Sequence, residues 1–207
     1  MTKYLFILIT FCSIGASAQS FTRIKNPVEC KQKINSQAQS TKSISADFKE
    51  QIYSSMFNTP KAGEGKLKYK KANMIRWEHS SPKQQVVLIN GSKVKLQEDG
   101  KEIKSVNTNQ VIKKVQGLMI QLFNGDFLNE KEFNITYYQS DERYKLVLKP
   151  KSSRMSKYIN HIVMEFGKED LTLKRMVMRE SDTESVVYTF SSVVINGQIS
   201  DSKFNSF

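Results

Sequence analysis

The sequence predicts an α+β fold built on one long, curved antiparallel sheet. Turn-forming residues recur about every 8 to 12 positions through most of the chain, which is typical of a meandering antiparallel sheet. Between the turns, apolar and polar residues alternate, as they do in strands that bury one face. Apolar residues repeat at helical spacing in two places, once near the N-terminus and once in the middle of the chain. The 207 residues are expected to form one domain with a sizeable core.

The first 18 residues predict a secretory signal peptide rather than a part of this domain. Lys3 supplies a short basic start, residues 4–14 are mostly apolar, and residues 16–18 fit the small-x-small pattern of a cleavage site. The apolar run is too short to span a bilayer, and the alternative is a buried N-terminal helix. Cleavage after Ala18 would leave residues 19–207 as a single exported domain.

The N-terminal helix is predicted from its start signals and its apolar stripe. Asn26 can cap the helix, Pro27 suits the first helical position, and Glu29 places an acid in the first turn. Apolar residues then follow at a spacing of four, at Cys30, Ile34 and Ala38. From residue 43 to residue 53 the period changes to two, which predicts the first long strand.

Three strands are predicted between residues 63 and 91. Leu67 and Tyr69 alternate with lysines, and Ile75 and Trp77 alternate with polar or flexible residues. A β-branched run follows at residues 86–89. Asn90-Gly91 then provides the positive φ angles that a tight hairpin requires.

The middle of the chain predicts a second helix. Asn107 or Thr108 can cap its start, and Asn124-Gly125 can end it. Its apolar residues repeat at helical spacing and form a wide stripe. They are Val111, Ile112, Val115, Leu118, Met119, Leu122 and Phe123.

Five more strands are predicted after the central helix. A basic, serine-rich loop at residues 151–157 separates the second of them from the third. The predicted strands are residues 133–138, 144–149, 158–166, 171–180 and 184–195. The turns between the others contain the Gly, Asp, Glu and Ser residues that interrupt strands.

The chain is strongly basic, with 32 Lys and Arg against 20 Asp and Glu and a formal net charge of +12. The basic residues are spread along alternating strand positions rather than gathered in blocks, so most are expected on solvated outer faces. An exported chain without a nucleic-acid-binding motif is not expected to bind nucleic acid. Attraction to anionic lipid headgroups or to an acidic docking surface remains open.

The cysteines exclude an internal disulfide in the mature chain. Cys12 lies within the signal peptide, and Phe11 before it does not fit the small residue that precedes an acylated cysteine. Cys30 is then the single cysteine of the mature chain. It is interpreted as a small hydrophobic residue on a helix face, with a reactive thiol as the alternative.

No residue pattern predicts an enzyme, a metal site or a cofactor. The two histidines, His79 and His161, and one mature cysteine make no metal-binding cluster of recognisable spacing. Ser-x-x-Lys matches at Ser80 and Ser200 do not open apolar helices, and their companion motifs are absent from the sequence. Neither a nucleophile elbow nor a phosphate-binding glycine loop occurs in the sequence. We therefore expect no catalytic residues.

A longer pattern carries a family resemblance. From Gly65 to Glu78 the chain reads Gly-x-x-x-Tyr-Lys-Lys-x-x-x-x-Arg-Trp-Glu, and an apolar strand and Asn90-Gly91 follow. In this order and spacing the pattern resembles the LolA family, which comprises periplasmic carriers that move lipoproteins from the inner to the outer membrane. Further segments that resemble the family are residues 45–48, 144–151 and 199–204.

The resemblance implies an incomplete barrel whose helices act as a lid over a concave apolar face, with acyl chains held between them. The implied function is a soluble periplasmic chaperone-carrier with acylated lipoproteins as its cargo. Its implied partners are an inner-membrane release transporter and, as an open question, an outer-membrane receptor. The carrier is expected to act as a monomer without a cofactor.

Two groups of apolar residues are candidates for lipid binding in such a cavity. The predicted wall consists of Phe48, Leu67, Tyr69, Ile75, Trp77 and Val87. The predicted lid consists of Val111, Val115, Leu118, Met119, Leu122 and Phe123. A wall for acyl chains has to be apolar, because an unpaired polar group there would cost desolvation. From the residues alone, a closed hydrophobic core is the more ordinary interpretation, and the resemblance is what favours a cavity.

One position departs from the family pattern. Family members commonly have Arg-Pro where this chain has Lys71-Ala72, and that arginine is associated with latching the lid through hydrogen bonds. Lysine keeps the charge but lacks the planar fork of donors. Lys71 is therefore interpreted either as a lid latch or as a solvated lysine in a turn.

Two other functions remain open. One is an envelope sensor or interaction domain on the same fold, which would bind protein partners rather than lipid. The other is a secreted hydrolase of an unrecognised type, which the absence of any catalytic motif disfavours.

Overall fold

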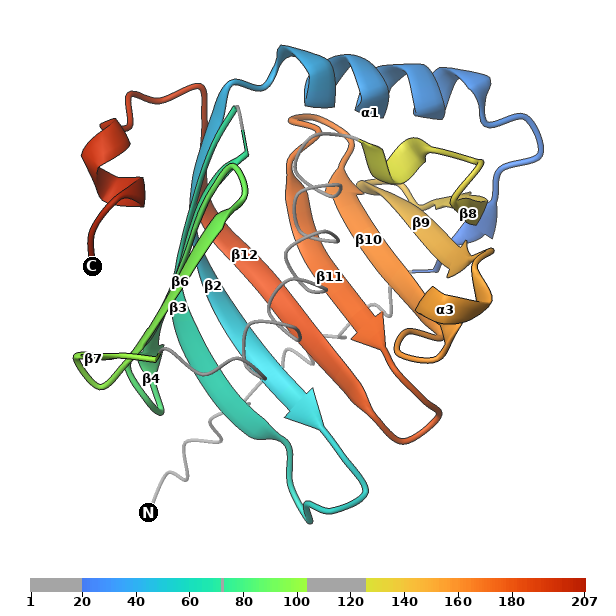
Figure 1. The fold of residues 1–207 in the computed structure, drawn as a ribbon. Coiled ribbons are helices and arrows are strands. Elements are labelled where there is room, and N and C mark those ends of the chain that lie inside the picture. Colours follow the sequence, from blue (N-terminus) through green and yellow to red (C-terminus); the bar gives the residue numbers. More distant parts are fainter. Residues whose placement is uncertain (1–19, 72, 104–125) are drawn as a thin grey trace, which may run out of the picture.

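The structure is a computed structural model that describes residues 20–71, 73–103 and 126–207. Within these ranges, twelve strands form one antiparallel sheet in the order β1-β8-β9-β10-β11-β12-β2-β3-β4-β5-β6-β7. Figure 1 shows this sheet as a strongly curved surface with α1 across its upper end. Its two terminal strands, β1 and β7, are not paired with each other, so the sheet is an open half-barrel. The predicted fold class is confirmed in the described residues.

The strands follow the predicted order along the chain. They are β1 (Thr22–Arg23), β2 (Ser43–Tyr53), β3 (Lys61–Lys70), β4 (Met74–Ser81), β5 (Gln85–Asn90), β6 (Lys93–Glu98), β7 (Lys101–Glu102), β8 (Phe133–Gln139), β9 (Arg143–Pro150), β10 (His161–Gly167), β11 (Leu173–Arg179) and β12 (Ser185–Ile195). The helical segments are α1 (Val28–Ser40), η1 (Asp126–Leu128), α3 (Ser153–Ser156) and η2 (Asp201–Phe204). The predicted central helix at residues 111–123 lies outside the described residues.

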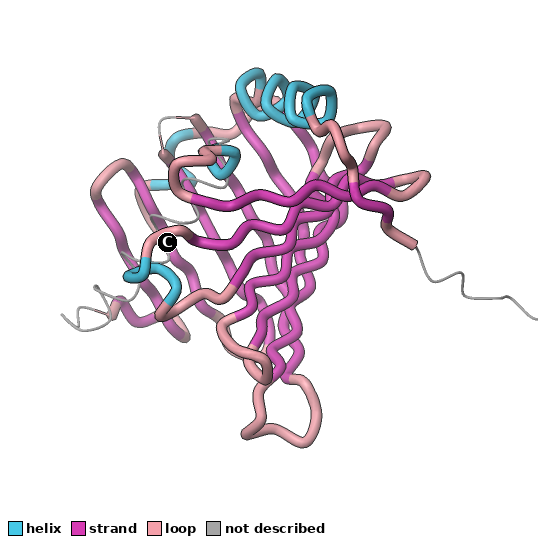
Figure 2. The backbone as a smooth tube through the Cα atoms, turned by 90° about the vertical axis from the view of Figure 1, so that its right-hand side faces the viewer, coloured by secondary structure: helices cyan, strands magenta, loops and turns pink. Residues whose placement is uncertain are grey.

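The last strand joins the two halves of the sheet. β12 pairs with β11 on one side and with β2 on the other, and Phe190 lies opposite Phe48 in that second pairing. Register shifts interrupt the β2–β12, β3–β4 and β10–β11 pairs. Bulges of this kind bend strands and increase their twist, which accounts for much of the curvature. Figure 2 shows the strands twisting together toward the end opposite α1.

The helix α1 is confirmed, but it begins one residue later than predicted: Pro27 is the N-cap residue and Val28 the first helical residue, so Pro27 does not occupy the first helical position. The Asn26 side chain accepts a hydrogen bond from the Val28 N–H at 3.4 Å, and Glu29 forms an exposed ion pair with Lys33 at 2.6 Å. At the other end, the Thr41 N–H and hydroxyl both donate to the Gln37 carbonyl, at 3.1 Å and 2.7 Å. These bonds fix where the chain leaves α1 and enters β2.

The main core lies between the sheet and α1. Cys30 and Ile34 from α1 are 4% and 2% exposed, and they belong to one buried cluster with residues of β2, β3, β4 and β8 to β12. Cys30 is buried and free, which confirms its interpretation as a small hydrophobic residue.

The Cys30 thiol is expected to make stability fall at alkaline pH. Burial raises the pKa of this thiol from 9.0 to about 11, so the folded chain keeps it neutral where the unfolded chain ionises. Its contribution is complete below pH 9 and is lost as the pH rises through about 11. Denaturant titrations at both ends of this window should show the unfolding free energy of the wild type falling by about 1 to 2 kcal/mol more than that of Cys30→Ala. Equal losses in the two proteins would contradict this.

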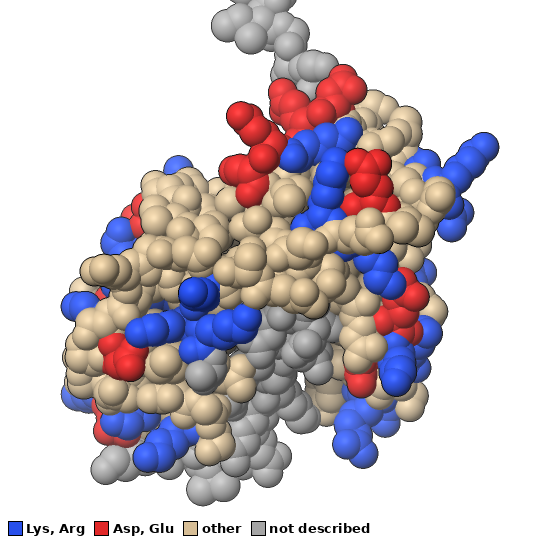
Figure 3. Space-filling model, turned by 90° about the horizontal axis from the view of Figure 1, so that it is seen from above, with Lys and Arg blue, Asp and Glu red and all other residues tan. Residues whose placement is uncertain are grey.

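The C-terminal segment covers part of the convex face. Arg76 donates to the carbonyls of Lys203 and Ser206, at 3.3 Å and 2.9 Å, and Phe204 is 1% exposed where η2 packs on β4 and β5. Figure 1 shows η2 outside the curved sheet. Figure 3 shows both basic and acidic side chains on the face seen from above, with uncharged residues between them.

Strand boundaries differ from the prediction in the C-terminal half. The strands expected to start at residues 158 and 171 start at His161 and Leu173. The basic loop contains the short helix α3, and the N–H groups of Tyr158 and Ile159 both donate to the Met155 carbonyl at 3.0 Å. Tyr158 and Ile159, which the apolar alternation had assigned to a strand, therefore belong to this turn.

Candidate functional site

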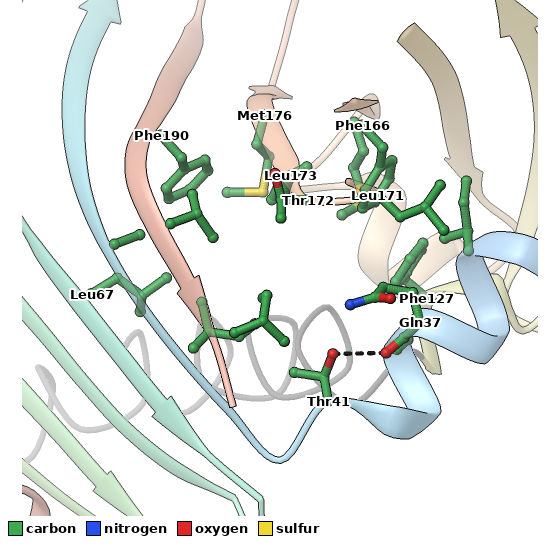
Figure 4. Close-up of a pocket in the computed structure, with 17 residues that line it drawn as sticks. Gln37, Thr41, Leu67, Phe127, Phe166, Leu171, Thr172, Leu173, Met176 and Phe190 are labelled. Carbon is green, nitrogen blue, oxygen red and sulfur yellow. Dashed lines mark hydrogen bonds between the residues drawn. The ribbon is translucent and has the colours of Figure 1, made fainter. Parts of the chain in front are cut away.

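An apolar pocket lies beneath the C-terminal half of α1, against the concave face of the sheet. Its volume is about 70 Å³. Figure 4 shows Leu67, Met176 and Phe190 of the sheet around the same space as Gln37 and Thr41 of the α1 end. The apolar lining residues are Ile34, Ala38, Ile44, Ala46, Leu67, Phe127, Met164, Phe166, Leu171, Leu173, Met176, Phe190, Val193 and Ile195.

The pocket presents few free polar groups. Three of its lining residues are polar, namely Gln37, Thr41 and Thr172. The Thr41 hydroxyl donates to the Gln37 carbonyl at 2.7 Å, and the Thr172 hydroxyl donates to the Asp170 carboxylate at 2.8 Å. These hydroxyls are satisfied within the protein, so an apolar guest would not leave them unpaired.

The size of the pocket limits what it holds in this conformation. Its volume of about 70 Å³ is roughly half the 150 Å³ of an engineered apolar cavity that binds benzene. The pocket can therefore take the end of an acyl chain, and a longer chain would require the covering elements to move.

The predicted wall residues lie together on β2 to β5. Phe48, Leu67, Tyr69, Ile75 and Trp77 are buried in the main core, and Val87 is partly buried against it. Leu67, Trp77 and Val87 form one cross-strand row, since each lies opposite the next in the register. Leu67 lines the pocket, and the other five continue the apolar surface away from it. Their role in lipid binding stays a prediction, and the six lid residues lie outside the described residues.

Sequence reasoning missed the part of the pocket that comes from the C-terminal strands. Met164 and Phe166 of β10, Met176 of β11 and Phe190 of β12 all line it. A signal was present, because large apolar residues alternate along β12 at Tyr188 and Phe190. That alternation predicts that one face of β12 is buried, but it does not predict that β12 pairs with β2.

A buried polar group interrupts the apolar surface near the far end of β2. The Glu50 carboxylate lies 3.5 Å from Nε2 of His79, and both side chains are largely buried. Burial raises the pKa of Glu50, but hydrogen bonds from His79 and Tyr188 lower it more, and the net pKa lies below its usual range. Burial beside Glu50 raises the pKa of Tyr188. Aromatic rings cover this group, with Trp77 and Tyr188 centroids 5.1 Å apart.

Lys71 is bonded to the end of α1. Its ammonium donates to the Gln39 carbonyl at 2.8 Å, and its backbone N–H donates to the Lys42 carbonyl at 2.8 Å. A positive charge at a helix C-terminus is stabilising, because the last carbonyls carry partial negative charge. Lys71 thus fastens the helix that covers the pocket. A contact of Lys71 with the central helix would involve residues that the structure does not describe.

The described residues give no support for a metal site or a membrane-spanning helix. Across residues 20–71, 73–103 and 126–207, no group of three or more His, Cys, Asp or Glu side chains is placed to hold a metal ion. In the same ranges, no helix has the length and apolar character that crossing a bilayer requires.

Comparisons with known proteins agree on one family. The sequence model described as outer membrane lipoprotein carrier protein LolA matches residues 39–206. An outer-membrane lipoprotein carrier protein from Chromohalobacter salexigens is 26% identical over 168 residues, which cover 80% of this chain and 77% of that protein.

Among solved structures, a LolA superfamily protein from Nitrosomonas europaea has a TM-score of 0.44 at 11% identity, covering 84% of this chain and 96% of that one. The MucA/MucB complex of Pseudomonas aeruginosa contains a chain with a TM-score of 0.45 at 7% identity, covering 88% of this chain and 62% of that one. Because the family match extends over residues 39–206, most of its length, this protein belongs to the LolA family of outer membrane lipoprotein carrier proteins.

Proposed function

We propose that this protein is a periplasmic carrier that shields the acyl chains of lipoproteins and moves them from the inner to the outer membrane. The observation that carries the proposal is the apolar pocket between α1 and the concave face of the sheet. The chain belongs to the LolA family, which supports assigning this pocket to an acyl chain. The relative from Chromohalobacter salexigens, which is named as a lipoprotein carrier, supports the same function.

The energetics explain why a carrier needs such a surface. Each methylene hidden from water contributes about 0.8 kcal/mol, so a sixteen-carbon chain represents about 12 kcal/mol before any costs. A lipoprotein with exposed acyl chains would therefore rarely leave a membrane for the aqueous periplasm. The Thr41 and Thr172 hydroxyls in the pocket wall are already paired within the protein, so an acyl chain that covers them adds no desolvation cost there.

Binding a whole acyl chain requires the pocket to enlarge. The predicted wall residues extend the apolar surface beyond the pocket, along β3, β4 and β5. In this proposal the central helix, with its stripe from Val111 to Phe123, is the lid that covers this surface when the carrier is empty. Opening the lid exposes apolar residues, which offsets part of the binding energy and permits release. Lys71 keeps α1 in place while the lid moves.

The proposed partners and location follow from the family and from the N-terminal sequence. LolA-family carriers are periplasmic, and a signal peptide cleaved after Ala18 would export this chain to that compartment. An inner-membrane transporter would load the carrier, and an outer-membrane receptor would accept the cargo where one exists. The carrier would work as a monomer and would need neither nucleic acid nor a cofactor.

The proposal predicts that the protein carries cargo when it is isolated from the periplasm. Mass spectrometry of protein purified from the periplasm should detect acylated lipoprotein or lipid, and a fluorescent fatty-acid probe should bind once the cargo is extracted. An empty protein that binds no probe would overturn the proposal, and the pocket residues would then be a core. The alternative of an envelope sensor would gain support if such a protein instead co-purified with a non-acylated partner.

A further inference from the structure

The loop between β2 and β3 presents apolar side chains to solvent at the end of the molecule opposite α1. Figure 1 shows this connection as the lowest part of the described chain, and Figure 2 shows it projecting beyond the twisted strands. Met56 at its tip is 81% exposed, the highest value among the exposed large hydrophobic residues of the described chain. Tyr53 at the end of β2 is 39% exposed.

Hydrogen bonds hold this loop in place. The Ser54 hydroxyl and the Ser55 N–H donate to the Glu184 carboxylate at 2.9 Å and 3.3 Å, which ties the loop to the turn between β11 and β12. The Met56 N–H donates to the Ser54 hydroxyl at 3.2 Å, and the Phe57 N–H donates to the Ser54 carbonyl at 3.0 Å. Met56 is therefore held outward by the fold of the loop, with the polar groups turned inward.

The tip contains the residue types that are common in proteins at a membrane–water interface. The Lys61 ammonium lies 3.8 Å from the centroid of the Phe57 ring, so a cation stands beside a partly exposed aromatic ring. Tyr53 adds an amphipathic ring, and such rings are enriched at the level of lipid headgroups. The Glu184 carboxylate is occupied by the loop itself, and Asp182 is an exposed acid on the neighbouring turn.

We propose that this tip, residues 53–61, is a membrane-docking element that inserts Met56 and Phe57 into the interface of an anionic bilayer. A projecting apolar tip fits a bilayer surface, which deforms around it, whereas a protein partner would need a matching cavity. The net charge of +12 adds a general attraction to anionic headgroups. This contact would bring the carrier to the membrane, and it does not depend on cargo in the pocket.

The test measures flotation of the exported chain with vesicles of phosphatidylethanolamine and phosphatidylglycerol, compared with phosphatidylcholine vesicles. We expect binding to the anionic vesicles, and we expect Met56→Ser to lower the partition coefficient about tenfold. Met56→Trp should bind more tightly, and its emission should shift to the blue on binding. Trp77 is 6% exposed and gives a background that vesicles do not change.

Tyr158→Ser is the matched control. Tyr158 is 53% exposed beside the basic loop at residues 151–157, where it is the strongest competing site for membrane contact. Its substitution should leave flotation unchanged. Equal binding of Met56→Ser and wild type, or loss of binding in Tyr158→Ser instead, would overturn the proposal. Because Met56 is far from the pocket, Met56→Ser should still bind the fatty-acid probe, which separates a docking defect from a failure of the carrier function.

Discussion

Substituting Gly65 with alanine should lower the melting temperature by about 10 °C. Gly65 lies at the bulge between β3 and β4, and a Cβ atom at this position would be 2.0 Å from the Glu78 carbonyl oxygen and 2.7 Å from the Phe48 ring. The carbonyl belongs to the backbone of β4, so relief requires the strand to move. Overpacking of this kind costs about 3 kcal/mol, and a protein of this size loses roughly 2 to 4 °C per kcal/mol.

The Gly65 substitution should also change the packing of the predicted wall residues. The Phe48 ring lies across Gly65, and its centroid is 4.9 Å from that of Trp77. Moving this ring would disturb the aromatic packing of β2 and β4, so probe binding should weaken together with stability.

Gly197→Ala is the control for the Gly65 substitution. Its added Cβ would meet the Val194 side chain at 3.2 Å, and a side chain can give way where a backbone carbonyl cannot. We expect a change of less than about 3 °C in thermal unfolding followed by circular dichroism. If Gly65→Ala has the same melting temperature as the wild type, β4 can shift to accommodate the added Cβ without loss of stability, and the prediction is wrong.

The fold was largely predictable because its signals are local. Alternation along residues 43–53 and the positive φ angle of Gly91, +59°, each depend on a few neighbouring residues. The positive φ predicted for Asn90 was wrong, because Asn90 is the last residue of β5 and pairs with Lys93. Strand starts were less predictable where another local structure competes, as at Tyr158, whose N–H closes the turn after α3. Around Tyr158 the apolar alternation of a strand continues, but the backbone of these residues forms a turn.

The pocket was predictable only in part, since it depends on which strands become neighbours. The placement of β12 beside β2 brings Phe190 opposite Phe48, although 142 positions separate them in the chain numbering. No local pattern encodes that pairing. The family signature lies in the N-terminal strands, so it led to Leu67 and not to Met164, Met176 or Phe190.

Lys71 shows the same limit at a single residue. The sequence placed it in a turn, as observed, and left its partner open between a lid and solvent. Its ammonium instead bonds to the Gln39 carbonyl at the end of α1. A lysine can reach such a carbonyl because one donor suffices, whereas the planar fork of an arginine suits several acceptors at once.

Substituting Ala38 with tryptophan should lower the affinity for a fatty-acid probe about a hundredfold. Ala38 is partly buried on α1 and lines the pocket, so an indole there would fill a space of about 70 Å³. An acyl chain that cannot enter leaves three or four methylenes in water, and each contributes about 0.8 kcal/mol. The loss of about 3 kcal/mol corresponds to that change in the dissociation constant.

Ser36→Trp, on the exposed face of the same helix, provides the comparison for this substitution. It adds the same indole outside the pocket, so its probe affinity should equal that of the wild type in a fluorescence titration. Ser36→Trp should melt with the wild type, whereas Ala38→Trp should melt several degrees lower, because an indole exceeds the pocket and displaces its neighbours. If Ala38→Trp binds the probe as the wild type does, acyl chains enter elsewhere along the concave face. The row of Leu67, Trp77 and Val87 would then be the surface to block, since it continues the apolar wall on β3, β4 and β5.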